Sequence, residues 1–365
     1  MSHADRIASV RGHLIGAEAL LVSDLTNLRW LTGFTGSNGW AIIGPGRPII
    51  VTDGRYGEQA RQQTEAAGLD AVVLVGATGA ETLAHLAAAA GGYQTLGFEA
   101  AHVSFQQHSV WAGAFVTTLV PTVGVVERYR RMKDPLEIEQ MAEACRIADQ
   151  ALAEVAPRLG DGLTEAEVRN LLEIRMRELG ATGPSYETIV ATGPTNAALP
   201  HHRPTDTLIE SGHTVIIDVG ALVGGYHSDM TRTFFIGEPT AQQRELYEVV
   251  LAAQTAGVAA VAAGMSVKEL DGVCRGIITE AGYGDWFTHG TGHGVGLLIH
   301  EDPFVNRAGD AILQVGDVVT VEPGVYHEGF GGIRIEDLVV VTSAGCRVLT
   351  ASPKDSPCLP SPPTI

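Results

Sequence analysis

Four carboxylates and one histidine in the second half of the chain have the types and spacing of a divalent-metal site. They are Asp218, Asp229, His293, Glu322 and Glu336. Taken singly, each has an ordinary structural explanation: Asp218 can cap a backbone amide, and Asp229 can pair with Arg232 at the surface. Taken together in one low-dielectric pocket, four carboxylates repel one another unless cations neutralise them. Four carboxylates and one imidazole can hold two divalent metals about 3.5–4 Å apart, which share a water and make it a nucleophile.

The acidic residues occupy matched positions in two similar segments, which predicts an internal duplication. Asp218 lies in SGHTVIIDVG and Glu322 in VGDVVTVEPG, and aligning the two acids also aligns the flanking glycines. Both β-branched runs are predicted strands. Asp229, in YHSDMTRTFF, corresponds to Glu336, in GIRIEDLVVV. A buried strand that ends in an acid is costly unless the acid is paired or binds a cation. The two halves are therefore expected to direct their carboxylates at one point.

A predicted helix precedes each of these strand pairs. Capping boxes begin at Thr164, in GLTEAEV, and at Ser266, in GMSVKEL. Each helix runs to a glycine at the same distance, Gly180 or Gly282. The repeated unit is thus helix, strand, strand, and its period is too long for a solenoid. We predict a pseudo-two-fold domain with a site on its axis.

A glycine-rich loop, HGTGHGVG, contains His289 and His293 and lies between the two acid-bearing strand pairs. Glycine lets the backbone approach a crowded centre, which would direct an imidazole at the metals. No glutamate follows His289, so the helical HExxH zinc motif is absent. The alternative is a flexible loop with two solvent-exposed histidines. Its position between four carboxylates favours the metal interpretation.

Composition limits the partners that the protein can have. The 365 residues suggest about two domains, and 45% of them are hydrophobic, enough for a large core. The net charge of −18 argues against nucleic acid, because phosphate binding needs clustered Lys and Arg. The basic cluster at residues 128–133, RYRRMK, is interpreted as a solvated linker face. The four cysteines form no CxxC pair and suit a reducing cytosol.

Two stretches of the sequence are candidate membrane-directed segments, and neither has the required pattern. The N-terminal MSHADRIASV lacks the basic-then-apolar pattern of a signal peptide. The most apolar stretch, residues 249–265, contains Gln254 and Thr255 and is too short for a membrane span. We expect a soluble cytoplasmic protein with no membrane partner.

The chain divides into a predicted α/β domain at residues 1–125, a second domain at 134–352 and a Pro-rich tail at 353–365. In the first domain, Gly44-Pro45-Gly46 predicts a hairpin, and no phosphate-binding loop follows the first strand. Residues 120–131 form the connection, and Asp134 with Pro135 begins a helix that extends to about residue 159. The tail is predicted to be disordered or loosely docked. The predicted strands of the first domain are residues 19–24, 40–44, 48–53, 71–76 and 95–99, and its predicted helices are 56–67 and 81–90.

The five-residue set resembles the dinuclear site of the pita-bread metallopeptidases, which include aminopeptidase P, prolidase and methionine aminopeptidase. The resemblance covers about residues 134–350, and a weaker one, in GSNGWAIIGPGRPIIVTDGRYGEQA, suggests the creatinase/prolidase N-terminal domain, which methionine aminopeptidases lack. It implies an α/β creatinase/prolidase-type domain followed by an α+β pita-bread catalytic domain. The motifs that carry it are TIVATGPTNAALPHHRPTD, VIIDVGALVGGYHSDMTRTF, HGTGHGVGLLIHEDP, VEPGVYHEG and GIRIED.

The resemblance also implies a reaction, hydrolysis of the Xaa-Pro peptide bond by a hydroxide that bridges two divalent metals. Glu322 would be both ligand and general base. His201 and His300 would contact the substrate, although an exchange of roles between His201 and its neighbour His202 stays open. The other residues implied in the pocket are Tyr186, Tyr326 and Arg334, together with His289, for which structural packing is an equal alternative.

One position departs from the resemblance. Some prolidases carry an arginine, which binds the dipeptide's carboxylate, where this chain has Phe304. Arg47 and Arg55 of the N-terminal domain are candidate substitutes, and Arg55 equally fits an ordinary structural pair. We expect a Xaa-Pro dipeptidase, with aminopeptidase P acting on longer Xaa-Pro peptides as the alternative.

Two other classes of function stay open at this stage. A catalytically silent pita-bread module would bind other macromolecules, but such modules typically lose ligands. Creatinase-like amidine hydrolysis needs no metal, and the intact ligand set argues against it. Among metals we expect manganese, with zinc, cobalt or iron compatible with the same donors. The resemblance further suggests a homodimer.

Overall fold

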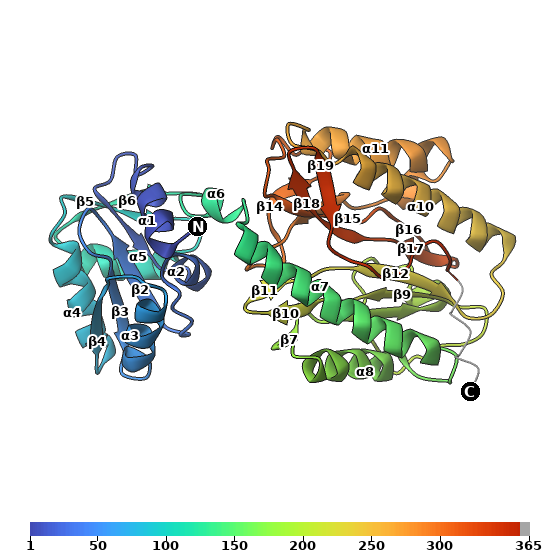
Figure 1. The fold of residues 1–365 in the computed structure, drawn as a ribbon, viewed down its shortest axis with the longest axis horizontal. Helices are drawn as coiled ribbons and strands as arrows, with labels where there is room; N and C mark the ends of the chain where they lie inside the picture. The colour runs from blue at the N-terminus through green and yellow to red at the C-terminus, as the bar shows by residue number, and fades with distance from the viewer. Residues whose placement is uncertain (358–365) are drawn as a thin grey trace. The chain divides into compact units, whose positions relative to one another are not determined.

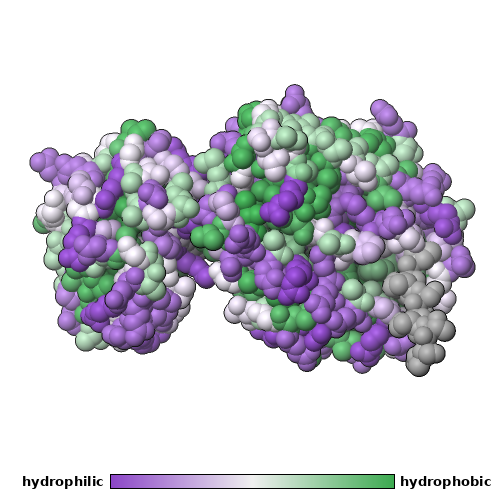
Figure 2. Space-filling model, viewed as in Figure 1, coloured by the Kyte–Doolittle hydropathy of each residue, from purple (hydrophilic) through white to green (hydrophobic). Residues whose placement is uncertain are grey.

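The computed structural model describes residues 1–357, and its internal contacts divide the chain into two units that meet at Arg130 and Arg131. The predicted domains, 1–125 and 134–352, lie on either side of this division. None of the helices in the described part of the chain is both long and apolar enough to cross a membrane. On the face seen in Figure 2, hydrophilic residues are distributed over both units with hydrophobic residues between them.

The N-terminal unit is built on a six-stranded mixed sheet with the order β4-β3-β2-β1-β5-β6. β1, β2 and β3 pair antiparallel, and the turn between β2 and β3 is the predicted Gly-Pro-Gly hairpin. The five predicted strands are confirmed, whereas β6 was not predicted and overlaps the beginning of the predicted connection, residues 120–131. β6 is a half-exposed edge strand that contains Pro121, so it lacks the apolar signal of a central strand. The strands are β1 (Ala19–Val22), β2 (Gly39–Ile43), β3 (Ile49–Asp53), β4 (Val72–Gly76), β5 (Thr95–Glu99) and β6 (Thr118–Thr122).

Helices cover this sheet on both faces. α4 and α5 pack on the face that includes Leu21, Val51 and Phe98, while the alternating Leu20 and Ile50 are buried on the other face. The predicted helices correspond to α3 and α4. α5 was not predicted because it buries one of its ten residues, Trp111. The helices are α1 (His3–Arg11), α2 (Leu25–Thr32), α3 (Gly57–Ala66), α4 (Gly79–Ala90), α5 (Phe105–Ala114) and α6 (Glu127–Arg130).

Two helix pairs sandwich the strands of the second unit (Figure 1). α7 and α8 pack together over one hydrophobic core, and α10 and α11 pack together over another. The capping box at Asp134 and Pro135 starts α7 as predicted. The helices are α7 (Pro135–Val155), η1 (Ala156–Arg158), α8 (Glu165–Glu178), α9 (Gly193–Asn196), α10 (Ala241–Ala260), α11 (Val267–Glu280) and η2 (Gly284–Trp286).

The strands between these helices form four sheets, in the orders β11-β10-β7, β12-β9-β8, β14-β13-β15-β18-β19 and β16-β17. Two antiparallel pairs carry the predicted acids: β9 with β12, and β15 with β18. The strands are β7 (Gly183–Pro184), β8 (Ile189–Thr192), β9 (Thr214–Asp218), β10 (Ala221–Val223), β11 (Tyr226–His227), β12 (Thr231–Phe235), β13 (Gly292–Gly294), β14 (Glu301–Val305), β15 (Val318–Val321), β16 (Gly324–His327), β17 (Gly331–Arg334), β18 (Asp337–Thr342) and β19 (Gly345–Val348).

The predicted duplication is confirmed in the backbone. α8 and α11 each span 14 residues and each begins at a capping box, formed by Thr164 or Ser266. The matched glycines adopt the same left-handed conformation, with φ of 85° at Gly212 and 92° at Gly316. A side chain would strain these turns, so glycine is needed in both copies. The two halves therefore deliver their strand pairs to the centre of the unit in the same way.

One expectation about a surface segment was wrong. The basic cluster at residues 128–133 is not a solvated face, because Arg131 pairs with the fully buried carboxylate of Asp317 and Lys133 pairs with Glu301. These two basic side chains form ion pairs with acids that are far away in the sequence. Of the tail, residues 358–365 lie outside the described residues. Residues 353–357 are held against the second unit, for example by a hydrogen bond from Tyr247 to the carbonyl of Lys354.

Candidate metal centre

All five predicted ligands line one cavity of about 310 Å³ in the second unit. Asp218 ends β9 and Asp229 precedes β12, while Glu322 follows β15 and Glu336 precedes β18. Because both strand pairs are antiparallel, each pair brings its two acids to the same end. His293 enters from β13. The duplicated fold therefore places the four carboxylates around a common point, as the sequence predicted.

The distances between these groups fit a cation site. His293 Nε2 lies 3.5 Å from Asp229 Oδ2 and 3.4 Å from Glu322 Oε1. Ligand atoms of Asp229, His293 and Glu336 all lie within 4.8 Å of one another. Oxygen and imidazole donors at this spacing match the preferences of divalent transition metals.

Burial makes the cluster unfavourable without a cation. Asp229 and Glu336 are 4% and 1% exposed. Burial raises the pKa of Asp229 well above its usual value, and the charges of Asp218 and Glu322 raise it further. Burial and then the charge of Asp229 raise the pKa of Glu336 in the same direction. Glu336 Oε1 is buried and has no hydrogen-bond partner within the described residues. A metal would bind next to an unpartnered carboxylate oxygen that lies among other acids. These residues therefore fit a bound divalent metal.

Arg334 is a buried cation that hydrogen-bonds to the carboxylate cluster and orients it. Its Nη2 donates to Asp218 Oδ2 at 2.7 Å, and its Nη1 donates to the hydroxyl of Tyr326 at 2.8 Å. Its Nε donates to Thr231 Oγ1 at 2.9 Å, and Thr231 in turn donates to Glu336 Oε2 at 2.7 Å. One guanidinium thus orients two ligands of opposite halves, as hydrogen-bond partners of metal ligands commonly do.

Two threonines orient carboxylates and were missed in the sequence. Thr231 contacts Glu336, and Thr320 Oγ1 donates to Glu322 Oε1 at 3.0 Å. The backbone N–H of His293 donates to Thr320 Oγ1, also at 3.0 Å. Their signal in the sequence is weak, since each is a threonine two residues from a predicted ligand within a β-branched run.

Tyr186 contributes its hydroxyl to the centre. The sequence placed its ring in the pocket wall, and Tyr186 does line the cavity. Its hydroxyl also contacts the carboxylates of Asp218 and, at 2.5 Å, Asp229. Burial and these two charges raise its pKa well above the usual value, so the phenol stays protonated and acts as a donor.

The histidines separate into cavity-facing and structural ones. His201 and His300 are exposed and line the cavity. His202 is 7% exposed, and its Nε2 lies 2.9 Å from the buried carboxylate of Glu165. His289 lines the cavity too, with Nδ1 donating to the carbonyl of Gly290 at 2.7 Å and Nε2 accepting from the Tyr326 hydroxyl at 3.0 Å. The geometry therefore distinguishes His201 from its neighbour, which the sequence did not.

Substitution of these two adjacent histidines is expected to affect different properties, stability for His202 and activity for His201. His202→Ala leaves Glu165 without a charge-assisted partner and should cost about 2 kcal/mol of stability, a Tm decrease of about 5 °C, with modest change in activity. His201→Ala should leave the Tm unchanged and lower kcat/KM on an Xaa-Pro peptide by roughly 10²-fold. Calorimetry and steady-state kinetics on both variants measure this. The reverse pattern would assign the cavity role to His202.

Two further predicted residues form ion pairs within the N-terminal unit. Arg47 and Arg55 belong to the N-terminal unit, where Arg47 pairs with Asp70 and Arg55 pairs with Asp53 at 2.8 Å. The expectation that either binds a substrate carboxylate stays a prediction. Phe304 lines the cavity of the second unit and is 45% exposed.

Comparisons with known proteins agree with this geometry. A Xaa-Pro dipeptidase from Bacillus anthracis is 39% identical in sequence, with a TM-score of 0.93, and the match covers 98% of this chain and 100% of that one. An X-Pro aminopeptidase from Thermotoga maritima MSB8 is 36% identical, with a TM-score of 0.87, covering 94% and 98%. A Xaa-Pro dipeptidase from Pyrococcus furiosus is 45% identical over 231 residues, 63% of this chain and 66% of that protein.

Two family models match successive parts of the chain. Residues 12–132 match the creatinase/prolidase N-terminal domain, and residues 139–343 match metallopeptidase family M24. The second match spans more than half of the chain and includes every acid that the duplication brings together. The expected pita-bread fold is thereby confirmed, and the chain belongs to metallopeptidase family M24.

Proposed function

We propose that this protein is a metal-dependent peptidase that cleaves the Xaa-Pro bond and prefers dipeptides. The observation that carries the proposal is the convergence of Asp218, Asp229, His293, Glu322 and Glu336 on one cavity. Similarity to proteins described as Xaa-Pro dipeptidases supports the choice of substrate. An intact donor set with an unpartnered carboxylate oxygen disfavours a silent binding module.

The five side chains would hold two divalent metals, which we propose to be manganese. Bound metals of this kind act as Lewis acids and lower the pKa of a bound water to near neutrality. The exposed fraction of the Glu322 side chain is 16%, against 6% for the side chain of Asp229, so the Glu322 carboxylate is the more open of the two. We assign Glu322 the role of general base, because its carboxylate is open to the cavity, where it can accept a proton from a water molecule.

The cavity histidines and Tyr326 complete the proposed machinery. His201 and His300 reach the open part of the cavity, where they contact the substrate and stabilise charge on its carbonyl oxygen. Arg334 donates to the Tyr326 hydroxyl, which donates to His289 Nε2. These two hydrogen bonds fix the orientation of the Tyr326 hydroxyl.

Location and assembly are also part of the proposal. We place the protein in the cytoplasm as a homodimer. Cys145, Cys274 and Cys346 are free thiols, as expected in a reducing compartment, and Cys358 lies outside the described residues.

Removal of the metals is expected to abolish hydrolysis of Ala-Pro, and Mn²⁺ should restore it. The freshly purified protein should contain about two metals per chain, as a carboxylate-bridged pair requires. Elemental analysis and release of free proline from Ala-Pro, before and after chelation, measure both quantities. Ala-Ala serves as the control substrate and should stay intact. Full activity in metal-free protein would contradict the proposal.

The second candidate, aminopeptidase P activity, has one observation in its favour. Among the described residues that line the cavity, Arg334 is the one Lys or Arg, and it already contacts Asp218. Within the described cavity lining of this unit, no other Lys or Arg is therefore available to bind a dipeptide's carboxylate, and Phe304 stands where some prolidases carry an arginine. A higher kcat/KM for Ala-Pro-Ala than for Ala-Pro would select this function. Loss of dipeptide preference in Arg47→Ala or Arg55→Ala would instead identify the missing anchor.

A further inference from the structure

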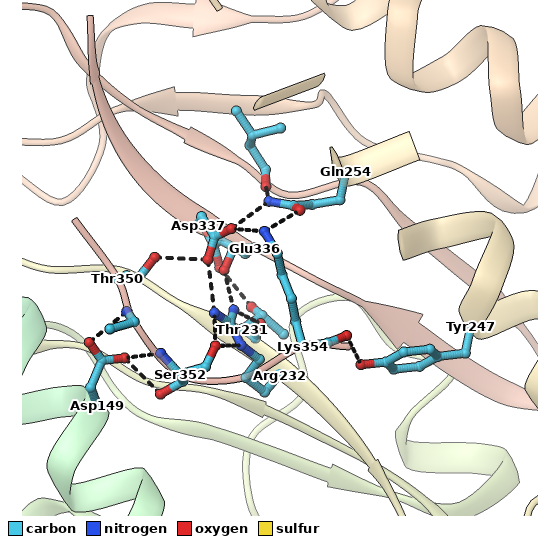
Figure 3. A network of polar contacts seen from close by, with 12 residues as sticks. Asp149, Thr231, Arg232, Tyr247, Gln254, Glu336, Asp337, Thr350, Ser352 and Lys354 are labelled. Carbon is cyan, nitrogen blue, oxygen red and sulfur yellow. Dashed lines mark hydrogen bonds and ion pairs between the residues drawn. The ribbon is translucent and has the colours of Figure 1, made fainter. Parts of the chain in front are cut away.

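Residues 350–357, named the strap here, run between Asp149 of α7 and Tyr247 of α10 and contact both (Figure 3). On α7, Asp149 Oδ1 accepts hydrogen bonds from the backbone N–H and hydroxyl of Ser352, at 2.9 and 2.7 Å. On α10, the hydroxyl of Tyr247 donates to the carbonyl of Lys354 at 2.8 Å. The strap is therefore attached to one helix of each pair.

Lys354 carries the positive charge of the strap into the protein. Its Nζ pairs with Asp337 Oδ2 and donates to Gln254 Oε1 at 2.7 Å. The Asp337 side chain is 2% exposed and also pairs with Arg232, whose Nη2 lies 2.8 Å from Oδ1. Gln254 Nε2 donates to Asp337 Oδ2 at 2.9 Å and to the carbonyl of Val321 at 3.3 Å. A buried carboxylate of this kind is stable only while its partners stay in place.

This network touches the backbone beside two predicted metal ligands. Asp337 directly follows Glu336, and Val321 directly precedes Glu322. Arg232 Nη1 donates to the carbonyl of Glu336 and, at 2.9 Å, to that of Thr231, the residue that orients the Glu336 carboxylate. Displacement of Asp337 would therefore move Glu336 along the same strand.

We propose that Lys354 is a positioning residue for the metal centre, because its pairing with Asp337 fixes the backbone that presents Glu336 and Glu322. Lys354 touches neither the cavity nor the reacting groups and acts through Asp337 and Gln254. The inference rests on the proposed metal centre and adds a determinant of metal affinity outside the five ligands.

Titration of metal-free protein with Mn²⁺ by calorimetry tests this role. Lys354→Met keeps the aliphatic stem and removes the charge, and it should raise the Kd for Mn²⁺ about tenfold, the lower end for partners of metal ligands. Lys354→Arg, which restores a cation, should bind within about threefold of wild type. Lys268→Met is the matched control, since Lys268 is exposed on α11, and it should bind as wild type does.

The outcomes separate the strap from the metal centre itself. Unchanged Mn²⁺ affinity in Lys354→Met overturns the proposal even if its Tm falls, because a purely structural tether would lower the Tm alone. Wild-type protein that binds no Mn²⁺ overturns the metal centre and the role of Lys354 together. If Lys354→Met fails to fold, Tyr247→Phe removes the hydrogen bond to the backbone carbonyl of Lys354 and should weaken Mn²⁺ binding about threefold, with wild-type affinity refuting the proposal.

Discussion

His293→Ala is expected to lower kcat/KM for Ala-Pro by at least about 10³-fold, equivalent to about 4 kcal/mol of transition-state stabilisation. His293 is the one imidazole among the five ligands. Its Nδ1 donates to the carbonyl of Gly294 at 3.1 Å, and its Nε2 lies 3.5 Å from Asp229 Oδ2 and 3.4 Å from Glu322 Oε1. Because Nδ1 is engaged with a backbone carbonyl, Nε2 is the ring nitrogen that could bind a metal together with these two carboxylates.

The backbone around His293 explains why an adjacent residue of the strand cannot replace it. A Cβ at Gly292 would lie 2.1 Å from the carbonyl oxygen of Thr320, and one at Gly294 would lie 2.4 Å from that of Asp302. The strand is therefore packed too tightly to shift another side chain into the site. Alanine leaves the centre with carboxylates alone.

Metal analysis and kinetics on His293→Ala measure this prediction. The variant should retain its fold and hold fewer metals than wild type, with residual activity that excess Mn²⁺ does not restore. His85→Ala, on α4 of the N-terminal unit, is the control and should behave as wild type. Wild-type activity in His293→Ala would remove His293 from the ligand set.

Arg334→Met is expected to give the largest loss of stability, about 3–5 kcal/mol in metal-free protein, or a Tm decrease of about 10 °C. Arg334 is 3% exposed and is the cation that contacts Asp218 in the absence of metal. Its removal leaves a buried cluster of carboxylates uncompensated. The partners Tyr326 and Thr231 also lose their donor, so activity should fall by at least about 10²-fold.

Thermal unfolding with chelator and with Mn²⁺ distinguishes this electrostatic cause from lost packing. Bound metal adds positive charge to the same cluster, and it stabilises the folded state by mass action. The difference in Tm between Arg334→Met and wild type should therefore narrow when Mn²⁺ is added. Arg203→Met is the control, because Arg203 is 77% exposed and its surface pair with Glu187 should be worth less than about 1 kcal/mol. A Tm difference that is equal with and without Mn²⁺ would indicate a packing defect.

Much of the catalytic unit is encoded in short stretches of sequence. The capping boxes at Thr164 and Ser266 and the β-branched runs that end at Asp218 and Glu322 are local signals, and local backbone preferences dictate them. The candidate carboxylate ligands follow from the same signals, since an acid at the end of a buried strand needs either an ion-pair partner or a bound cation. The N-terminal sheet was also predictable, except for the edge strand β6, whose half-exposed residues carry little pattern.

The sequence alone indicated the duplicated fold, the five candidate ligands and the family resemblance, because each is recognised from short local motifs such as a capping box or a strand that ends in an acid. Only the tertiary structure decided which partner each polar side chain has. Arg131 and Asp317 are 186 residues apart, and Thr231 and Glu336 are 105 apart. The choice of His201 over His202, the hydroxyl role of Tyr186 and the pairing of Lys354 with Asp337 likewise depend on contacts between distant segments. Such contacts leave no periodic or local pattern, since burial and charge compensation arise only when the chain has folded.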